Sequence, residues 1–153
     1  MNNKLTLLNK SAPFTARNPS PLHDDLIIHF PHFGTPEQGY LAVAESNQTC
    51  PFPIARTYWV YGCPNGQQRG GHAHYQHHQL LVCVSGEVEV LLTDGYEQKI
   101  FVLNDPTIGL YQKPLLWGDL VHRNNSALVV LASHPYAEAD YIRNFDDFLK
   151  IVA

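Results

Sequence analysis

The sequence predicts an all-β fold of the sandwich or barrel type in a single domain. Eleven prolines and ten glycines interrupt the 153 residues at short intervals. The apolar runs between them are short and rich in β-branched and aromatic residues, which is typical of strands. Many short strands at this spacing favour a sandwich or barrel. The length and a hydrophobic content of 44% suffice for one compact core.

Strands are predicted wherever a run of β-branched or aromatic residues is bounded by turn residues. The turn signals SGE at 85–87 and TDGYEQ at 93–98 predict hairpins between neighbouring strands. A histidine-rich segment around residues 72–74 is interpreted as a further strand. The other predicted strands cover residues 40–46, 55–62, 79–86, 87–95, 98–104, 107–112 and 127–133.

The two ends of the chain differ from this pattern. Residues 137–152 predict one short C-terminal helix, whose early acidic residues and late Lys150 suit the helix dipole. Residues 1–39 are expected to form an irregular arm, because prolines recur between residues 13 and 36. The apolar positions of the predicted helix fall on a single stripe, formed by Ile142, Phe145, Leu149 and Val152.

Charge and cysteine content argue against several classes of protein. The formal net charge of −4 argues against general binding of nucleic acids or anionic membranes. The N-terminus lacks the long apolar run of a signal peptide, and no apolar stretch approaches the ~18 residues of a membrane span. The three cysteines are odd in number and lack metal-site spacing, so reduced thiols in a cytoplasmic protein are expected.

The segment RGGHAHYQHHQ, residues 69–79, contains four of the nine histidines. Alternate side chains on a strand share a face, so His72 and His74 point the same way, roughly 7 Å apart by strand rise. Gly70 and Gly71 before them leave room for a ligand near the backbone. The pattern therefore predicts two imidazoles side by side in the interior of a β-barrel.

One interpretation of the histidines is a metal site. Cupin proteins, which are jelly rolls, often combine His-x-His with an acid a few residues later and a further His. Here Gln79 holds the acid position, and an amide is a poor ligand for a transition metal. His78 and His122 could still complete a site. A metal-dependent cupin enzyme is therefore kept as an alternative, although we expect no metal or cofactor.

The other interpretation is proton transfer without a metal. A neutral imidazole can accept and donate a proton near neutral pH. Two imidazoles on one wall suit a reaction that removes a proton from one carbon and returns it to the next, as in the isomerisation of a keto sugar through an enediol. For His77 and His78 we favour a structural, hydrogen-bonded role.

Cationic and phenolic side chains indicate how a nucleotide sugar would bind. Arg56 and Arg69 are the only Lys or Arg residues between positions 18 and 98. Their guanidinium forks match the oxygens of a diphosphate. Tyr58 shares a strand face with Arg56, whereas Tyr61 lies on the other face, and either face could be the inner one.

Four motifs together resemble a known family. They are RGGHAH, the SG…DG hairpin, GLY…P..W and the closing LAS…Y.E.DYIR..D.F, all within residues 54–149. On these motifs the chain is similar to the thymidine-diphosphate-sugar 3,4-ketoisomerases of the WxcM-like cupin group. The resemblance implies a metal-free, cupin-type jelly-roll barrel, with residues 1–153 as one domain and the jelly roll at 40–134. It also implies a homodimer.

The resemblance further implies the substrate and the reaction. Members of the family move the carbonyl of a dTDP-4-keto-6-deoxyhexose from C4 to C3, in deoxysugar biosynthesis for surface polysaccharides or glycosylated metabolites. By the same resemblance, His74 would take the proton from C3 and His72 would relay protons with the sugar oxygens. Arg56 and Arg69 would lie near the diphosphate.

The resemblance leaves one tyrosine open between two positions. A tyrosine of the strand before the histidines belongs to the family's active site. We assign Tyr61 to the catalytic group and Tyr58 to substrate binding. Gln79 and Trp117 complete the expected contacts with the substrate.

Three positions depart from the family pattern and bear on the exact activity. His78 replaces a common Glu just before the glutamine, Gly118 replaces a common His after the tryptophan, and Gln38 stands where Arg is usual. A non-catalytic module that binds a sugar nucleotide is therefore a second alternative, beside the metal-dependent enzyme.

Overall fold

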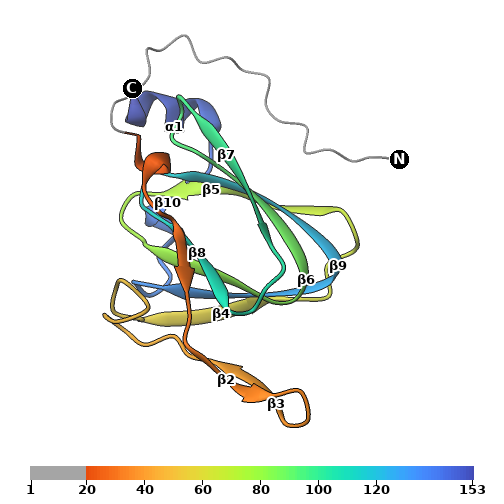
Figure 1. Ribbon diagram of the computed structural model, residues 1–153. Coiled ribbons are helices and arrows are strands. Elements are labelled where there is room, and N and C mark those ends of the chain that lie inside the picture. Colours follow the sequence, from red (N-terminus) through yellow and green to blue (C-terminus); the bar gives the residue numbers. More distant parts are fainter. Residues whose placement is uncertain (1–19) are drawn as a thin grey trace.

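The computed structural model describes residues 20–153, which form mainly antiparallel strands (Figure 1). The strands are β1 (Ile27–His29), β2 (His32–Thr35), β3 (Gly39–Ala42), β4 (Arg56–Val60), β5 (Gln67–His74), β6 (Gln79–Thr93), β7 (Gln98–Leu103), β8 (Ile108–Gln112), β9 (Trp117–Ala132) and β10 (Tyr141–Ile142). The helices are the 3-10 turns η1 (Pro21–His23) and η2 (Glu138–Asp140) and the α-helix α1 (Phe145–Val152). The main sheet has the order β1-β8-β6-β9-β5-β10, with β4 paired to β9 and β7 to β6.

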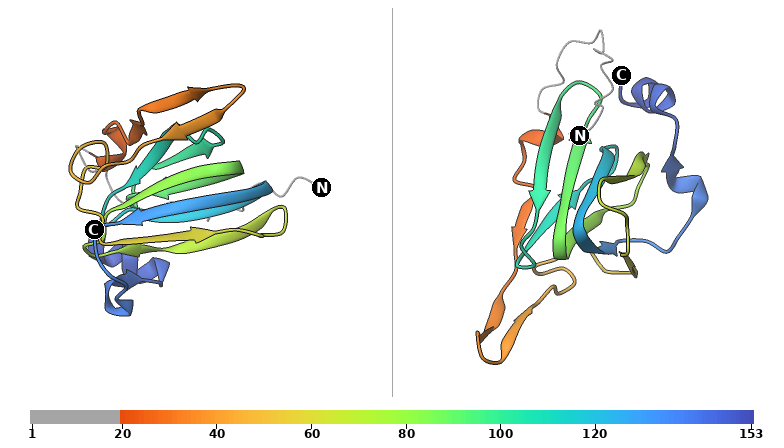
Figure 2. Two further views of the ribbon diagram at one scale, coloured as in Figure 1. Left: turned by 90° about the horizontal axis from the view of Figure 1, so that it is seen from below. Right: turned by 90° about the vertical axis from the view of Figure 1, so that its right-hand side faces the viewer.

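Two long strands, β6 and β9, run through the molecule and hold two layers together. Along one half, β6 pairs with β8 and β9 pairs with β4; along the other half, β6 pairs with β7 and β9 pairs with β5. The two strands also pair with each other over nearly their full length. The sheet therefore folds over on itself as a jelly roll, without closing into a complete barrel (Figure 2).

The fold-over requires both long strands to bend at the same level. β6 bends at Ser85–Gly86, where its register with β9 shifts, and β9 bends at Asn124 and Asn125, which both have positive φ. A Cβ on Gly86, whose φ is +71°, would lie 2.6 Å from the backbone oxygen of Asn124. The turn residues at 85–87 therefore form a bulge inside one strand, and the predicted hairpin at this place is wrong.

The all-β prediction is confirmed by the observed strands. The second predicted hairpin, at 93–98, joins β6 to β7, with Thr93 opposite Gln98. The first half of β9 is not among the strands predicted from the sequence. Its inward positions include Gly118 and His122, which line a cavity instead of an apolar core, so the apolar alternation of a strand is weak there.

The C-terminal helix is shorter than predicted. α1 begins at Phe145, and the side chain of Asn144 caps it by accepting a backbone hydrogen bond at 3.0 Å. The predicted first part of the helix instead forms η2 and β10, because Tyr141 and Ile142 pair with the end of β5. Among residues 20–153, no helix has the length and apolar character needed to cross a membrane.

The N-terminal arm is more ordered than predicted over its second half. Residues 20–39 include η1, β1 and β2, and β1 pairs with β8 at the edge of the main sheet. The rest of the predicted arm, residues 1–19, lies outside the described residues. β2 and β3 form a hairpin that projects from the body of the molecule, and every residue of both strands is exposed (Figures 1 and 2).

Candidate active site

A cavity of about 410 Å³ lies among strands β4, β5, β6, β8 and β9, bordered by the segment that precedes α1. A concave site of this size is typical of small-molecule binding. The wall includes five residues that the sequence assigns to the site: Arg56, Tyr58, Arg69, His72 and Gln79.

Strand β4 supplies one wall because its side chains alternate. Arg56, Tyr58 and Val60 line the cavity, whereas Trp59 is 63% exposed on the outer face. Tyr61 follows on the outer side, is 72% exposed and does not line the cavity. The structure therefore does not bring Tyr61, which the sequence assigns to the catalytic group, to this cavity, whereas Tyr58 lines it.

A bulge in strand β5 lets an arginine and a histidine point into the same cavity. Arg69 and His72 are three residues apart, so a regular strand would place them on opposite faces. The register with β9 shifts between Gly70 and His72, and Gly70 and Gly71 have φ values of +84° and +70°. A Cβ on Gly70 would lie 2.5 Å from the backbone oxygen of Gly118, so glycine permits this close approach.

The rings of His72 and His74 lie side by side, with centroids 5.0 Å apart and planes at 89°. His72 lines the cavity, whereas His74 is only 2% exposed and is not part of the wall. The Nε2 atom of His74 lies 3.2 Å from Nε2 of Gln79, which does line the cavity. His74 is therefore next to the cavity wall, behind Gln79.

Hydrogen bonds fix the tautomer of His74. Its Nδ1 atom lies 3.0 Å from Oδ2 of Asp140, and because an ionised carboxylate only accepts, Nδ1 carries the hydrogen. The Nε2 amide of Gln79 donates to the Tyr58 hydroxyl at 3.3 Å and faces Nε2 of His74, which accepts through its lone pair. His74 is thus a neutral imidazole whose basic nitrogen faces Gln79.

Burial keeps both imidazoles of the pair uncharged at neutral pH, because desolvation disfavours the charged form. Burial and the neighbouring His72 lower the pKa of His74 from 6.5 to about 4, against the opposing effect of its hydrogen bond with Asp140. Burial also lowers the pKa of His72. Burial raises the pKa of Tyr58, so its side chain stays a neutral phenol.

The buried side-chain nitrogens and oxygens without a protein partner, within the described part of the chain, all belong to residues of this cavity. They are Nε and Nη2 of Arg56, Nδ1 of His72 and Nε2 of His122. A buried polar atom without a partner costs about 1–3 kcal/mol. Their concentration in one cavity indicates a site for a polar ligand, in which Arg56 can meet an anion.

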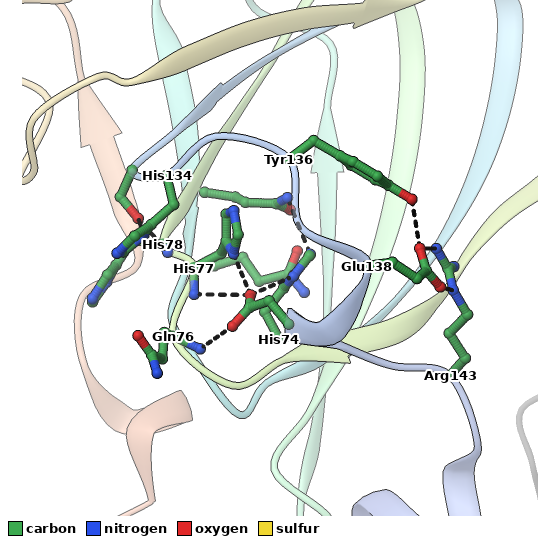
Figure 3. Close-up of polar contacts among 12 residues, drawn as sticks. His74, Gln76, His77, His78, His134, Tyr136, Glu138 and Arg143 are labelled. Atoms are coloured by element: carbon green, nitrogen blue, oxygen red, sulfur yellow. Dashed lines mark hydrogen bonds and ion pairs between the residues drawn. The ribbon is translucent and has the colours of Figure 1, made fainter.

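Asp140, in η2, is a residue that the sequence analysis did not assign to the site. Its carboxylate accepts from the backbone N–H groups of Gln76 and His77 at 2.9 and 3.2 Å, and from the rings of His74 and His77. Figure 3 labels these three donor residues, His74, Gln76 and His77. Burial opposes its ionisation, but the hydrogen bonds from His77 and the backbone prevail and lower the pKa of Asp140. The DYIR motif contains Asp140 and is the sequence signal that could have found it.

His77 and His78 lie outside the cavity wall and are held by hydrogen bonds of their own. Nε2 of His77 lies 2.9 Å from the carbonyl oxygen of Pro135. Nδ1 of His78 lies 2.6 Å from the hydroxyl of Tyr111, and the His78 ring packs against Phe52.

Within residues 20–153, side chains of the metal-ligating types gather closely at one place. One donor atom each of His74, His77 and Asp140 lies within 4.8 Å of the others. These atoms take part in the hydrogen bonds around the Asp140 carboxylate. The further ligands considered from the sequence, His78 and His122, are not part of this group.

Trp117, which the sequence assigns to substrate binding, does not line the cavity. It is 4% exposed and packs against Phe145 and Phe148 of α1. Because side chains alternate along β9, Gly118 takes the position at the cavity wall. Trp117 instead anchors the C-terminal helix.

Further residues of the wall come from strands that the sequence could not place at the cavity. A Cβ on Gly118 would lie 2.8 Å from Nε2 of Gln112, so the glutamine side chain fills the space next to the glycine. Tyr141 lies against both imidazoles, with ring centroids 5.0 Å from His72 and 4.3 Å from His74. Both Gln112 and Tyr141 line the cavity.

Comparison with known proteins agrees with the motifs. The family model described as "FdtA: WxcM-like, C-terminal" matches residues 23–153. The TDP-4-oxo-6-deoxy-alpha-D-glucose-3,4-oxoisomerase of Aneurinibacillus thermoaerophilus is 38% identical over 117 residues, which make up 76% of this chain and 84% of that protein.

Solved structures share the fold along most of the chain. QdtA, a sugar 3,4-ketoisomerase from Thermoanaerobacterium thermosaccharolyticum solved with TDP, has a TM-score of 0.79 at 36% identity and covers 82% of this chain and 92% of its own. A 3,4-ketoisomerase from Helicobacter canadensis has a TM-score of 0.78 at 35% identity and covers 82% of this chain and 95% of its own. The chain therefore belongs to the FdtA family of WxcM-like proteins, the sugar 3,4-ketoisomerases that the sequence motifs indicate.

Proposed function

We propose that the protein is a dTDP-4-keto-6-deoxyhexose 3,4-ketoisomerase, which moves the carbonyl from C4 to C3 through an enediol. The proposal depends on one observation: two neutral imidazoles, His72 and His74, adjoin a cavity that gathers unpartnered buried polar atoms. The relative QdtA supports the substrate class, since it was solved with TDP and, as a mutant, with TDP-4-keto-6-deoxyglucose.

The proposed reaction is a redistribution of protons. The lone pair on Nε2 of His74 takes the proton from C3, and the electrons of that C–H bond form a C3=C4 double bond while the C4 oxygen gains a proton. The O3 proton of this enediol then leaves as C3=O forms, and the electrons of the double bond take a proton at C4 from His74. His72, whose Nδ1 lacks a protein partner, passes the proton between the two oxygens.

The side chain of Gln79 controls access to the proposed base. Its amide lies against Nε2 of His74, so the bound sugar must displace this contact before the nitrogen can accept a proton from carbon. Tyr58 stays a neutral phenol, and its hydroxyl accepts a hydrogen bond from Gln79. The Tyr58 hydroxyl would therefore lie next to the oxygens on C3 and C4 of the bound sugar. Gln79 and Tyr58 therefore orient the sugar above His74.

Arg56 and Arg69 are the groups proposed to hold the diphosphate. The Arg56 guanidinium lies over the Tyr58 ring, 5.0 Å from its centroid, and its buried Nε and Nη2 lack protein partners. Arg69 is more exposed and lines the same cavity. Two guanidinium groups can each make paired hydrogen bonds to phosphate oxygens.

Incubation with dTDP-4-keto-6-deoxyglucose in deuterated water, followed by proton NMR, tests the function. We expect the carbonyl to move to C3 with exchange of the ring hydrogen, equally with and without a chelator. His74→Asn should lose at least ~100-fold in kcat while still binding TDP. Loss of activity in chelator would favour the metal-dependent enzyme, and TDP binding without exchange would favour the non-catalytic module.

We also propose that the protein is a homodimer that works in the cytoplasm. An isolated two-stranded hairpin is marginally stable in water, which supports a partner at β2–β3. The hairpin exposes three large apolar side chains: Phe33 (60%), Tyr40 (65%) and Leu41 (56%). The cytoplasmic proposal is supported by the free thiols of Cys50, Cys63 and Cys83.

A further inference from the structure

His77 lies between two hydrogen-bond acceptors. Its Nε2 atom is 2.9 Å from the carbonyl oxygen of Pro135, and its Nδ1 atom contacts Oδ2 of Asp140. A carbonyl oxygen only accepts hydrogen bonds, so Nε2 carries a hydrogen. An ionised carboxylate also only accepts, so Nδ1 carries a hydrogen as well. A ring that donates a hydrogen bond from each nitrogen would be an imidazolium.

The surroundings of Asp140 favour the ionised form of its carboxylate. Two backbone N–H groups and two imidazole rings converge on its oxygens, so the carboxylate accepts at both oxygens. The side chains of His77 and Asp140 are 2% and 11% exposed. A largely buried ion pair with its remaining positions hydrogen-bonded is a strong interaction, and removing one partner leaves an uncompensated charge.

The same carboxylate oxygen also holds His74. Oδ2 of Asp140 accepts from Nδ1 of His74 at 3.0 Å, and the His77 and His74 rings have centroids 5.0 Å apart. A carboxylate that already pairs with a cation is a weaker acceptor for the second ring. A positive charge on His77 would also act directly against a second positive charge on His74.

We propose that His77 is a charged positioning residue that acts through Asp140, fixing the tautomer of His74 and keeping His74 uncharged over a wider pH range. The inference deepens the proposed function, because the base whose charge it controls is His74. Consistent with this, His77 is one of the groups that lower the pKa of His74, after burial and His72.

Other titratable groups face the two rings. His134 lies against His77, with ring centroids 5.0 Å apart, and His78 follows His77 in the chain. On the other side, His72 and Tyr141 face His74. Further along the same segment, the Glu138 carboxylate is paired with Arg143 at 2.6 Å.

NMR of the resting protein with nitrogen-15-labelled histidine tests the charge independently of catalysis. At pH 7.5 we expect both ring nitrogens of His77 to show the N–H signals of an imidazolium, while His74 shows one N–H and one lone-pair nitrogen. His77→Gln assigns the His77 signals by their loss. A neutral His77 ring with a single N–H would overturn the proposal.

The pH profile of kcat/KM tests the effect on His74. His77→Gln removes the charge, so the acid limb should move to higher pH by about 1 unit, which is a ~10-fold loss on that limb. His77→Lys keeps a cation beside Asp140, and the groove next to His77 gives the longer side chain room, so the limb should stay near its wild-type position. His78→Gln, which removes a neighbouring imidazole without contact to Asp140, should also leave it unchanged.

Two results would contradict the proposal, and a third would separate it from the proposed function. If His77→Gln and His77→Lys are less stable but share the wild-type acid limb, His77 is only a structural clamp. If chelator-treated protein binds one Zn²⁺ and releases protons, and His77→Gln abolishes this binding, the positive charge beside Asp140 is a metal ion and not a protonated His77. If the wild-type protein shows no ring-hydrogen exchange, the isomerase proposal fails while the NMR result on His77 still stands by itself.

Discussion

At the scale of residues, the chemistry of the site depends on which nitrogen carries a hydrogen. Asp140 accepts from Nδ1 of His74, and this leaves the lone pair of the opposite nitrogen facing Gln79. Burial makes the charged form of His74 costly, so the ring stays a base. A change in donors and acceptors at these three positions should therefore alter turnover more than ligand affinity.

Replacing Gln79 by glutamate tests this arrangement. A carboxylate beside Nε2 of His74 would draw a proton onto that nitrogen, giving an imidazolium that cannot act as a base. We expect Gln79→Glu to lower kcat by ~100-fold or more, while the Kd for TDP, which depends on Arg56 and Arg69, stays within about threefold. Steady-state kinetics and calorimetric titration measure the two effects. Unchanged kcat would contradict the assignment of His74 as the base.

The buried His74 also predicts how stability depends on pH. Its pKa is about 4 in the folded protein, against about 6.5 in an unfolded chain, so the unfolded state binds more protons between these values. The free energy of unfolding should therefore be highest above pH 6.5 and should fall by about 3 kcal/mol as the pH drops to 4. Urea unfolding at several pH values measures this, and His74→Gln should flatten that part of the curve.

At the scale of elements, the bulge in β5 decides which side chains reach the cavity. The two glycines of the bulge both have positive φ, but their surroundings differ. A Cβ at Gly70 meets the backbone of Gly118 at 2.5 Å, whereas a Cβ at Gly71 meets only Asp119 Oδ1, at 3.8 Å. Both positions carry a conformational cost for other residues, and only Gly70 adds a backbone clash.

Alanine at each glycine separates these two effects. Gly71→Ala should cost about 1–2 kcal/mol of stability through its left-handed backbone alone. Gly70→Ala should cost clearly more and should also lower activity, because the clash pushes β5 and therefore His72 away from β9. Chemical denaturation and kcat/KM of the two variants measure the difference. Equal losses would mean that the bulge is not tightly packed against β9.

At the scale of the whole molecule, the shared strands β6 and β9 enclose the site while the hairpin β2–β3 stands apart. The two layers and the C-terminal segment all contribute to the cavity wall. The hairpin contributes nothing to that wall and leaves its large apolar side chains exposed. This contrast suits a hairpin whose partner surface belongs to another subunit.

Sedimentation analysis tests the proposed dimer. The wild-type protein should sediment with twice the mass of one chain. The double change Phe33→Ser and Leu41→Ser should shift it towards monomer by removing apolar contact area from the hairpin. Ile100→Ser, which removes a side chain 48% exposed on β7, is the matched control and should leave the mass unchanged. A monomeric wild type would contradict the dimer.

The sequence by itself determined what depends on residues close together in the chain. The period of two placed His72 and His74 on one face, and it placed Arg56 with Tyr58 on another. The turn residues at 93–98 marked a real hairpin. These features follow from the local geometry of a strand and its turns, which a short stretch of sequence encodes.

Only the tertiary structure decided which faces are inside and which distant groups meet. The inner face of β4 selected Tyr58 over Tyr61, and α1 covered Trp117. Asp140 reached His74 across 66 residues of chain. Such contacts arise because β6 and β9 bend and pair with several partners, and no local pattern specifies which residues this brings together.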